Sequence, residues 1–145
     1  MIQTVNGKDT IIHFKKDHIL KLVIFTDSTS CTSCAMKQMY HWDPFIDKAY
    51  KSNHMLQLMF VFSPKKNEID LLNKSLKIAI YDYPIYIDTL RVFEKMNPHL
   101  PKNKALHTFL LDEHNQVILV GSPLYNKKIE EMFYKIVEEK LGKLQ

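Results

Sequence analysis

The stretch Lys21–Tyr40, KLVIFTDSTSCTSCAMKQMY, joins an apolar segment to a pair of closely spaced cysteines. Its segment Leu22–Phe25 is continuously apolar, which is typical of a buried β-strand. A short polar turn, Thr26–Ser30, follows, and after it come Cys31 and Cys34 at the start of a helix-forming run. The sequence therefore predicts a strand that delivers a Cys-x-x-Cys pair to the first turn of a helix.

Cysteines at the first turn of a helix have an unusual chemical environment. The backbone N–H groups of that turn have no partner inside the helix and favour nearby negative charge. A thiol there loses its proton more readily, and the thiolate is the reactive form. Cys34 lies three residues after Cys31, so the two sulfur atoms are close enough to form a disulfide. With two cysteines in the chain, this spacing indicates redox or metal chemistry rather than a framework of structural disulfides.

The composition is that of one compact domain. The chain has 145 residues, of which 46% are hydrophobic, so we expect a single domain over residues 1–145. The formal net charge of +4 comes from lysines spread along the chain, without the basic stripe that nucleic-acid binding requires. No apolar stretch approaches the roughly 18 residues of a transmembrane helix. We therefore expect no nucleic-acid partner and no transmembrane segment.

Strand patterns and helix patterns alternate along most of the chain. The predicted strands are Ile11–Phe14, Leu22–Phe25, Leu56–Phe62 and Pro84–Asp88. The predicted helices run from the cysteines to about His41, onward from Asp43-Pro44, from a cap at Asn67, and over Leu90–Met96. Such alternation predicts an α/β fold, in which a parallel sheet core carries helices on both faces. Residues 1–20 are assigned to an N-terminal extension or edge segment.

The same pattern predicts which large side chains are buried. On the first two helices, the side chains expected to face the protein core include Met36, Met39, Tyr40 and Tyr50. Trp42, just beyond the cysteine helix, is expected to pack. The tyrosines at 81, 83 and 86 are interpreted as the surface of a strand rather than as a binding platform.

The clearest local signal is a β-hairpin near the end of the chain. Thr108–Asp112 and Val117–Gly121 are apolar strands that flank a turn of polar residues, Glu113–Gln116. Asn115 is a residue type that tolerates the left-handed conformation found in such turns. The hairpin adds an antiparallel edge and makes the predicted sheet mixed.

A strongly periodic helix is predicted over Lys127–Leu141. Its apolar stripe consists of Ile129, Met132, Phe133, Ile136, Val137 and Leu141. Asn126 precedes it and is a preferred residue for capping a helix start.

In this order of elements the chain resembles the thioredoxin superfamily, and it is most similar to the exported TlpA/ResA-like thiol-disulfide oxidoreductases. The resemblance covers roughly residues 20–141. It rests on the Cys-x-x-Cys pair after a buried strand, the hairpin TFLLDEHNQVILVG and the final amphipathic helix. It implies a thioredoxin-like three-layer fold, with a central mixed sheet and helices on both faces.

The resemblance also implies a mechanism and a set of partners. Cys31 would attack a partner's disulfide, and Cys34 would resolve the mixed disulfide that forms. The protein would act on protein thiols or disulfides and exchange electrons with an upstream donor or acceptor. It would need no cofactor other than its own redox-active Cys31–Cys34 disulfide, and no metal. Because TlpA/ResA-like proteins work outside the cytoplasm, we expect a mature fragment in the periplasm or cell envelope, with the cytoplasm as the alternative.

The sequence departs from the family pattern at three places. Family members usually have an aromatic residue before the first cysteine, where this chain has Ser30. Many have a proline between the cysteines, where this chain has Thr32 and Ser33. The family's cis-proline, which shapes the surface that receives the substrate, falls at Leu106, so partner specificity and turnover are expected to differ. The expected substrate groove is lined by Thr32, Ser33, Leu106 and His107.

Asp27 is a second candidate catalytic residue. It lies four residues before Cys31 and could accept the proton of Cys34, as buried acids do in related proteins. The alternative is a solvated aspartate that organises the turn, since aspartate is common in turns.

Three alternatives to redox activity are open for the cysteine pair. A zinc site needs four ligands, so the pair would have to be completed by histidines such as His13 and His18. A copper(I) site could add Met36 and Met39, although methionines at helical spacing more often fill a core. The third possibility is a thioredoxin-like module that binds partners without catalysis.

Overall fold

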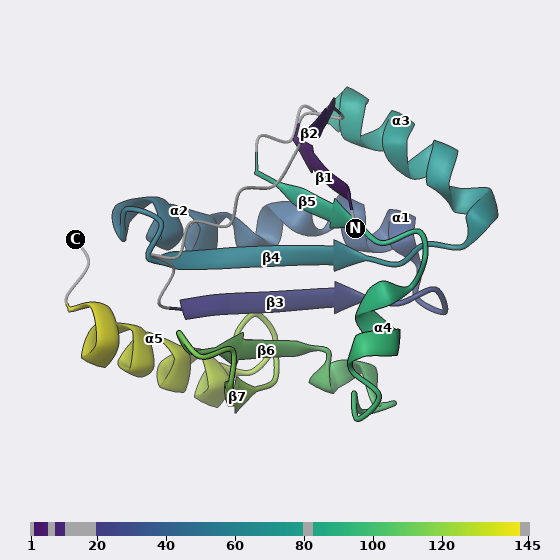
Figure 1. Cartoon of the computed structure of the whole chain (residues 1–145). Helices are drawn as coiled ribbons and strands as arrows, with labels where there is room; N and C mark the ends of the chain where they lie inside the picture. The colour runs from purple at the N-terminus through teal and green to yellow at the C-terminus, as the bar shows by residue number, and fades with distance from the viewer. Residues whose placement is uncertain (1, 6–7, 11–19, 80–82, 143–145) are drawn as a thin grey trace. The chain divides into compact units, whose positions relative to one another are not determined.

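The computed structural model describes residues 2–5, 8–10, 20–79 and 83–142 (Figure 1). Its strands are β1 (Ile2–Val5), β2 (Lys8–Thr10), β3 (Leu20–Thr26), β4 (Leu56–Phe62), β5 (Ile85–Ile87), β6 (Thr108–Leu111) and β7 (Val117–Val120). Its α-helices are α1 (Thr32–Lys37), α2 (Asp43–Lys51), α3 (Ile69–Ala79), α4 (Val92–Met96) and α5 (Lys127–Leu141). Its 3-10 helices are η1 (Met39–Trp42), η2 (Lys66–Glu68) and η3 (Lys104–Leu106).

Within the described part of the chain, seven strands form one mixed sheet in the order β2-β1-β5-β4-β3-β6-β7. β4 and β5 are parallel, with Phe60 opposite Ile85. β3 and β6 are antiparallel, with Val23 opposite Phe109, and β7 continues the antiparallel pairing. Helices separate β3 from β4, β4 from β5 and β5 from β6 along the chain. The α/β class and the mixed sheet predicted from the sequence are confirmed.

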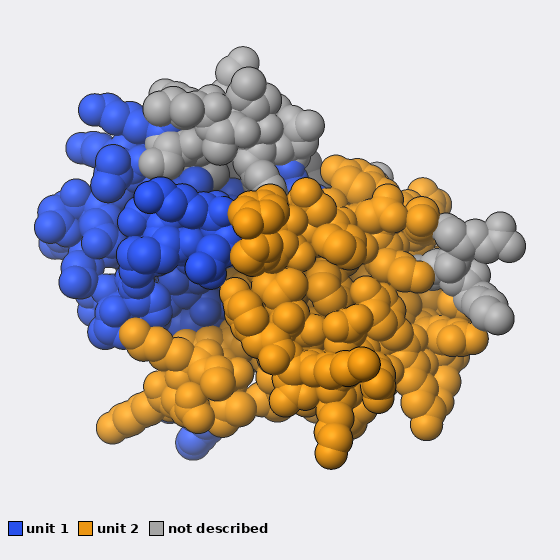
Figure 2. All heavy atoms as spheres, turned by 180° about the vertical axis from the view of Figure 1, so that it is seen from behind, with its two compact units in different colours: residues 1–14, 25–39, 59–100 blue, residues 15–24, 40–58, 101–145 orange. Residues whose placement is uncertain are grey.

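By its internal contacts the chain divides into two compact units (Figure 2). The first unit comprises residues 1–14, 25–39 and 59–100, and the second comprises residues 15–24, 40–58 and 101–145. α1, α3 and α4 belong to the first unit, whereas α2, α5 and the hairpin of β6 and β7 belong to the second. The assignment of residues 1–145 to a single domain stays a prediction.

The first unit has a core built from β4, β5 and the end of β3. Its buried side chains include Phe60, Val61, Phe62, Ile85, Tyr86 and Ile87. Phe25 of β3 is also buried and stacks on Phe93 of α4, with 4.6 Å between the ring centroids. Tyr83 and Tyr86 are 5% and 1% exposed, so their prediction as strand surface is wrong. Tyr86 packs inside because β5 is buried along its whole length. Tyr83 precedes β5, and its ring packs against that of Phe60.

The start of α4 depends on a buried carboxylate directly after β5. Asp88 is 1% exposed, and its side chain accepts the backbone N–H groups of Val92 at 2.9 Å and Phe93 at 2.7 Å. The first N–H groups of a helix have no partner inside the helix, so a side-chain acceptor stabilises the start. Asp88 therefore fixes the turn of helix that holds Phe93 against Phe25.

The second unit has an aromatic core between α2 and α5. Phe45 of α2 lies 5.5 Å from Phe133 and 5.8 Å from Tyr134, measured between ring centroids. Trp42 is buried and lies 5.4 Å from Phe45, which confirms its predicted packing role. The ammonium of Lys48 lies 5.5 Å from the centroid of the Tyr134 ring, a favourable cation–π arrangement.

The final helix matches the sequence prediction at both ends. α5 covers Lys127–Leu141, and the side chain of Asn126 accepts the N–H groups of Lys128 and Ile129. The cap predicted at Asn126 is therefore confirmed. The prediction that Met132 belongs to the buried apolar stripe is wrong, because its side chain is half exposed.

The helix after the cysteines is shorter than predicted. α1 ends at Lys37, and η1 follows as a separate 3-10 helix before α2 begins at Asp43. A 3-10 helix has three residues per turn, so the α-helical spacing does not carry through it. Met39 stays buried, but Tyr40 is 64% exposed, contrary to the prediction, and so is Tyr50 at 52%.

One further sequence prediction differs from the structure, and two concern residues that the structure does not describe. Asn67 lies inside η2 rather than capping a helix, since the chain makes a 3-10 turn before α3. The predicted strand Ile11–Phe14 and the residue Tyr81 lie outside the described residues. Across the residues that the structure covers, no helix combines the length and apolar character needed to cross a bilayer.

Candidate active site

The candidate site begins with the turn that follows β3, residues 27–30. One carboxylate oxygen of Asp27 accepts the N–H of Thr29 at 3.0 Å, the Thr29 hydroxyl at 2.8 Å and the Ser30 hydroxyl at 2.9 Å. The N–H of Ser30 also donates to the backbone carbonyl of Asp27 at 3.2 Å. These bonds form an Asx-type turn, which aspartate favours because its short side chain reaches the backbone two residues on. The turn directs the chain from the buried strand into the cysteine pair.

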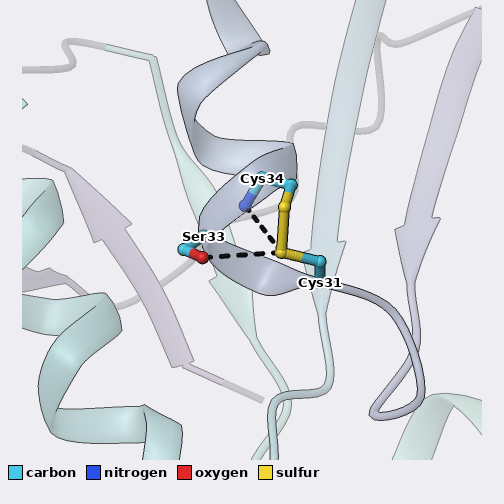
Figure 3. The surroundings of a disulfide bond; sticks show 3 residues. All are labelled: Cys31, Ser33 and Cys34. Atoms are coloured by element: carbon cyan, nitrogen blue, oxygen red, sulfur yellow. Dashed lines mark hydrogen bonds between the residues drawn. A yellow bond between two sulfur atoms is a disulfide. The ribbon is translucent and has the colours of Figure 1, made fainter.

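Cys31 and Cys34 form a disulfide with an S–S distance of 2.09 Å and a Cα–Cα distance of 5.2 Å (Figure 3). Both residues are exposed. Cys31 is the N-cap of α1, and its sulfur accepts the backbone N–H of Cys34 at 3.2 Å. The Ser33 hydroxyl lies 3.5 Å from the same sulfur. Two polar hydrogens can therefore be directed at the Cys31 sulfur.

This arrangement favours negative charge on Cys31. A hydrogen bond from a backbone N–H is stronger when its acceptor is charged, so the contact from Cys34 stabilises a thiolate more than a thiol. The N-cap position adds the unpartnered N–H groups of the first helical turn. The exposed position leaves the sulfur within reach of another protein. The predicted strand, turn and helix start are present. They place the Cys31 sulfur where its thiolate, the nucleophilic form, is stabilised after the disulfide is reduced.

The two residues between the cysteines face different surroundings. Ser33 is exposed, whereas Thr32 is only 4% exposed and turns toward α3. Both line a small pocket between α1 and the η2–α3 segment. The prediction that Thr32 and Ser33 line a substrate groove stays a prediction, but the structure places both at the wall of a cavity beside the disulfide.

Leu106 and His107 belong to the second unit. Leu106 ends η3 and is half buried, and the side chain of Asn103 caps that 3-10 helix by accepting the N–H of Ala105. His107 is 5% exposed, and its Nε2 lies 2.6 Å from the carbonyl oxygen of Pro101. The ring of His107 thus holds the loop 101–107 in shape. The assignment of these two residues to the substrate groove stays a prediction.

The metal site considered from the sequence can be compared with the structure only in part. In the described ranges, no group of three histidine, cysteine, aspartate or glutamate side chains is arranged to hold an ion. His13 and His18, the proposed histidine ligands, lie outside the described residues. Of the methionines considered for copper, Met39 is 4% exposed and serves as core packing.

Two features of the first unit were not predicted from the sequence. One is the capping role of Asp88, although an aspartate between an apolar run and a short helical pattern is a usable capping signal. The other is the pairing of Thr32 with Glu68, each of which has a buried side-chain oxygen without a hydrogen-bond partner in the described part of the chain. These residues are far apart in the sequence, and only the packing of α1 against α3 brings them to one pocket.

Comparison with known proteins places the fold in one class. No protein-family model matches the chain, and no curated protein matches it. Among solved structures, a thioredoxin-like protein in its oxidised form has a TM-score of 0.58 at 15% identity, covering 95% of this chain and 89% of that protein. An uncharacterised thioredoxin-like protein from Porphyromonas gingivalis has a TM-score of 0.57 at 15% identity, covering 97% of this chain and 88% of that protein.

A third similar structure carries a functional description. It is a protein from Bacteroides thetaiotaomicron proposed to be a protein disulfide isomerase, with a TM-score of 0.54 at 17% identity, covering 99% of this chain and 86% of that protein. At these identities the likeness establishes the fold. The chain therefore has a thioredoxin-like fold that carries a Cys-x-x-Cys disulfide, and its assignment to the TlpA/ResA-like class stays a prediction.

Proposed function

We propose that this protein is a thiol-disulfide oxidoreductase that reduces or exchanges disulfides in other proteins through Cys31 and Cys34. The observation that carries the proposal is the hydrogen bond from the Cys34 N–H to the exposed sulfur of Cys31 at the N-cap of α1. It supports Cys31 as the thiolate that attacks, because charge on that sulfur is stabilised by a donor already in position. The thioredoxin-like fold adds support from its general use in this chemistry.

The proposed reaction begins with both cysteines reduced. The Cys31 thiolate attacks one sulfur of the substrate disulfide, forming a mixed disulfide and releasing the other substrate sulfur as a thiolate. The Cys34 thiolate, formed when a base takes its proton, then attacks the Cys31 sulfur and releases the second substrate thiolate. The substrate disulfide is reduced to two thiols, and the Cys31–Cys34 disulfide closes. Each further turnover requires a dithiol partner that reduces this disulfide again.

Single-turnover exchange with a peptide disulfide tests the proposal. We expect the reduced wild-type protein to convert one equivalent of substrate, and Cys31→Ser to abolish the reaction. Cys34→Ser should instead accumulate a mixed disulfide on Cys31, visible by mass spectrometry. Serine is itself a preferred N-cap residue, so Cys31→Ser should keep α1 folded, which circular dichroism checks. If the wild-type thiols form no reversible disulfide and reduce no substrate, the proposal fails and a non-catalytic binding module takes its place.

We further propose that this oxidoreductase belongs to the TlpA/ResA-like class and acts in the periplasm or cell envelope. This proposal is supported by the sequence resemblance in the cysteine segment, the hairpin and the last helix. Fractionation of cells that produce the natural protein tests the compartment. The reduction potential of the Cys31–Cys34 pair tests the direction of electron flow. A value near ~−270 mV indicates a reductant, and a value near ~−120 mV indicates an oxidant.

A further inference from the structure

A small pocket lies directly beside the disulfide, between α1 and the η2–α3 segment of the same compact unit. Its lining residues are Thr32, Ser33, Met36, Glu68, Leu71 and Leu72. Ser33 connects the pocket to the redox centre, because its hydroxyl lies 3.5 Å from the sulfur of Cys31 (Figure 3). Ser33 is exposed and Leu71 is 56% exposed, so the pocket reaches the protein surface.

Two residues that line this pocket each have a buried polar atom without a partner among the described residues. The atoms are the hydroxyl oxygen of Thr32, in a residue 4% exposed, and one carboxylate oxygen of Glu68. No hydrogen bond or ion pair to either atom is found among the described residues. A buried polar group left unpaired is costly, and a carboxylate oxygen more so than a hydroxyl. These two oxygens therefore call for a hydrogen-bond donor from outside the protein.

The size and lining of the pocket narrow the donor to one chemical class. The cavity volume is about 30 Å³, which is room for one or two water-sized groups. An ammonium group is of that size, carries three donors and has no acceptor, so it matches a carboxylate oxygen and a hydroxyl. A planar guanidinium is larger. The apolar side chains of Met36, Leu71 and Leu72 suit the methylene stem behind an ammonium.

We infer that this pocket is a subsite that binds a primary ammonium group, supplied by a lysine side chain close to the disulfide of a protein substrate. Glu68 and Thr32, the two polar side chains with unpartnered oxygens, accept its hydrogen bonds. The inference rests on the proposed oxidoreductase function for its substrate, and it assigns a preference that the cysteines alone do not provide. It also makes Thr32 a specificity residue rather than a spacer between the cysteines.

Two linked measurements test the inference. The first uses reduced protein and a series of peptide disulfides that carry lysine, norleucine or arginine near the cystine, and it compares second-order exchange rates. The second uses oxidised protein and cysteine-free peptides with the same three residues, and it follows the amide resonances of Thr32 and Glu68. We expect lysine to be favoured over norleucine roughly tenfold in both, as for a hydrogen bond to a charged group, and arginine to fall between them.

Isosteric variants identify the groups responsible. Glu68→Gln and Thr32→Val should each reduce the preference for lysine, and Glu68→Gln should bring the ratio of lysine to norleucine close to one. Glu139→Gln removes the same charge from an exposed position on α5 and should retain the wild-type ratio.

The outcomes separate this inference from the proposed function. If exchange proceeds but lysine and norleucine peptides react equally in the wild-type protein, the subsite is refuted and the oxidoreductase proposal stands. If no peptide is exchanged, the oxidoreductase proposal fails, and the binding measurement decides the subsite. The subsite is then supported if the lysine peptide shifts the amide resonances of Thr32 and Glu68 in the wild-type protein, and if these shifts are lost with the norleucine peptide and in Glu68→Gln. The absence of such shifts overturns it.

Discussion

Two turns of this protein are each organised by an aspartate, one before the disulfide and one in the hairpin. In the hairpin, one carboxylate oxygen of Asp112 accepts the N–H groups of His114 and Gln116, both at 2.9 Å. The backbone N–H of Asp112 in turn donates to the carbonyl of Gln116 at 3.0 Å. Before the disulfide, Asp27 accepts one backbone N–H and the hydroxyls of Thr29 and Ser30.

The difference lies in what the polar groups bind. In the hairpin turn the aspartate side chain binds backbone N–H groups, and the chain then returns into the antiparallel pairing of β6 and β7, which has a register shift between Leu110 and Leu111. The turn at Asp27 also binds two side-chain hydroxyls, those of Thr29 and Ser30. It is followed by Cys31 and Cys34, which are exposed, and by Thr32, which has an unpartnered buried oxygen among the described residues. The hairpin turn therefore leads into a second strand, whereas the turn at Asp27 leads into groups that a partner could reach.

The largest expected effect concerns Asp27 as a proton acceptor. Asp27→Asn keeps an oxygen that can accept the turn's hydrogen bonds but removes the base. If Asp27 takes the proton of Cys34, the variant should slow resolution of the mixed disulfide about 100-fold, a typical contribution of general base catalysis. Stopped-flow exchange measures this rate.

Asp112→Asn is the matched control, because it makes the same substitution in the other aspartate turn. It should exchange disulfides at the wild-type rate. An Asp27→Asn protein that is equally unaffected would show that Asp27 acts only on the shape of its turn, and the two aspartates would then be equivalent.

Reduction of the disulfide should affect the two turns unequally. The crosslink joins residues with a sequence separation of 3, and the chain-entropy relation for so short a loop predicts a stabilisation of about 2 kcal/mol. We expect reduction to lower the free energy of unfolding by about that amount and to speed local hydrogen exchange in α1. Amides of β6 and β7 that open locally should be unchanged. A Cys31→Ser, Cys34→Ser double variant should not respond to reductant.

The elements predicted best from the sequence were those that local signals specify. The strand Leu56–Phe62 and the helix Lys127–Leu141 have the bounds that their apolar patterns predicted. Asn115 adopts the left-handed conformation expected of it, with φ at 59°. In each case the signal lies within a few consecutive residues. The spacing of apolar side chains, the residue that caps a helix and the residue that allows a turn are all local properties of the sequence.

The features that the sequence did not predict depend on contacts between distant segments. The break after Lys37 exposes Tyr40, although the apolar spacing continues past it. The burial of Tyr83 follows from its packing in the first unit, where its ring lies 5.9 Å from Phe60. The pocket joins Thr32 to Glu68 through helix packing. The cysteine pair was found because its chemistry is local, whereas the proposed specificity pocket was not, because its walls come from two helices.

A smaller effect is expected at the tip of the hairpin. Asn115 has a left-handed backbone, and a residue with an ordinary side chain pays a steric penalty there. Asn115→Ala should lower the free energy of unfolding by about 1 kcal/mol, in part because Lys21 also loses its hydrogen bond to the Asn115 side chain. Asn115→Gly should restore most of the loss, since glycine adopts this conformation without strain. Urea denaturation measures both, and an equal loss in the two variants would instead assign the effect to Lys21.

The smallest effect is a dependence of stability on pH that originates at Asp112. The N–H of Gln116, together with that of His114, holds the pKa of the Asp112 carboxyl below its usual value, against an opposing effect of burial. A carboxyl with a depressed pKa in the folded protein stabilises the fold above the unfolded pKa of about 3.9. That stability is lost as pH falls through the folded pKa.

The melting temperature of the wild-type protein should therefore exceed that of Asp112→Asn at neutral pH, and the difference should shrink as the solution is acidified. Asn115→Gly keeps Asp112 and its backbone donors, so it should show the wild-type dependence on pH. A difference between wild type and Asp112→Asn that stayed constant through the acidic range would show that the shape of the side chain, rather than its charge, organises the hairpin. The hairpin aspartate would then resemble an uncharged turn residue, and the contrast with Asp27 would rest on the disulfide and its pocket alone.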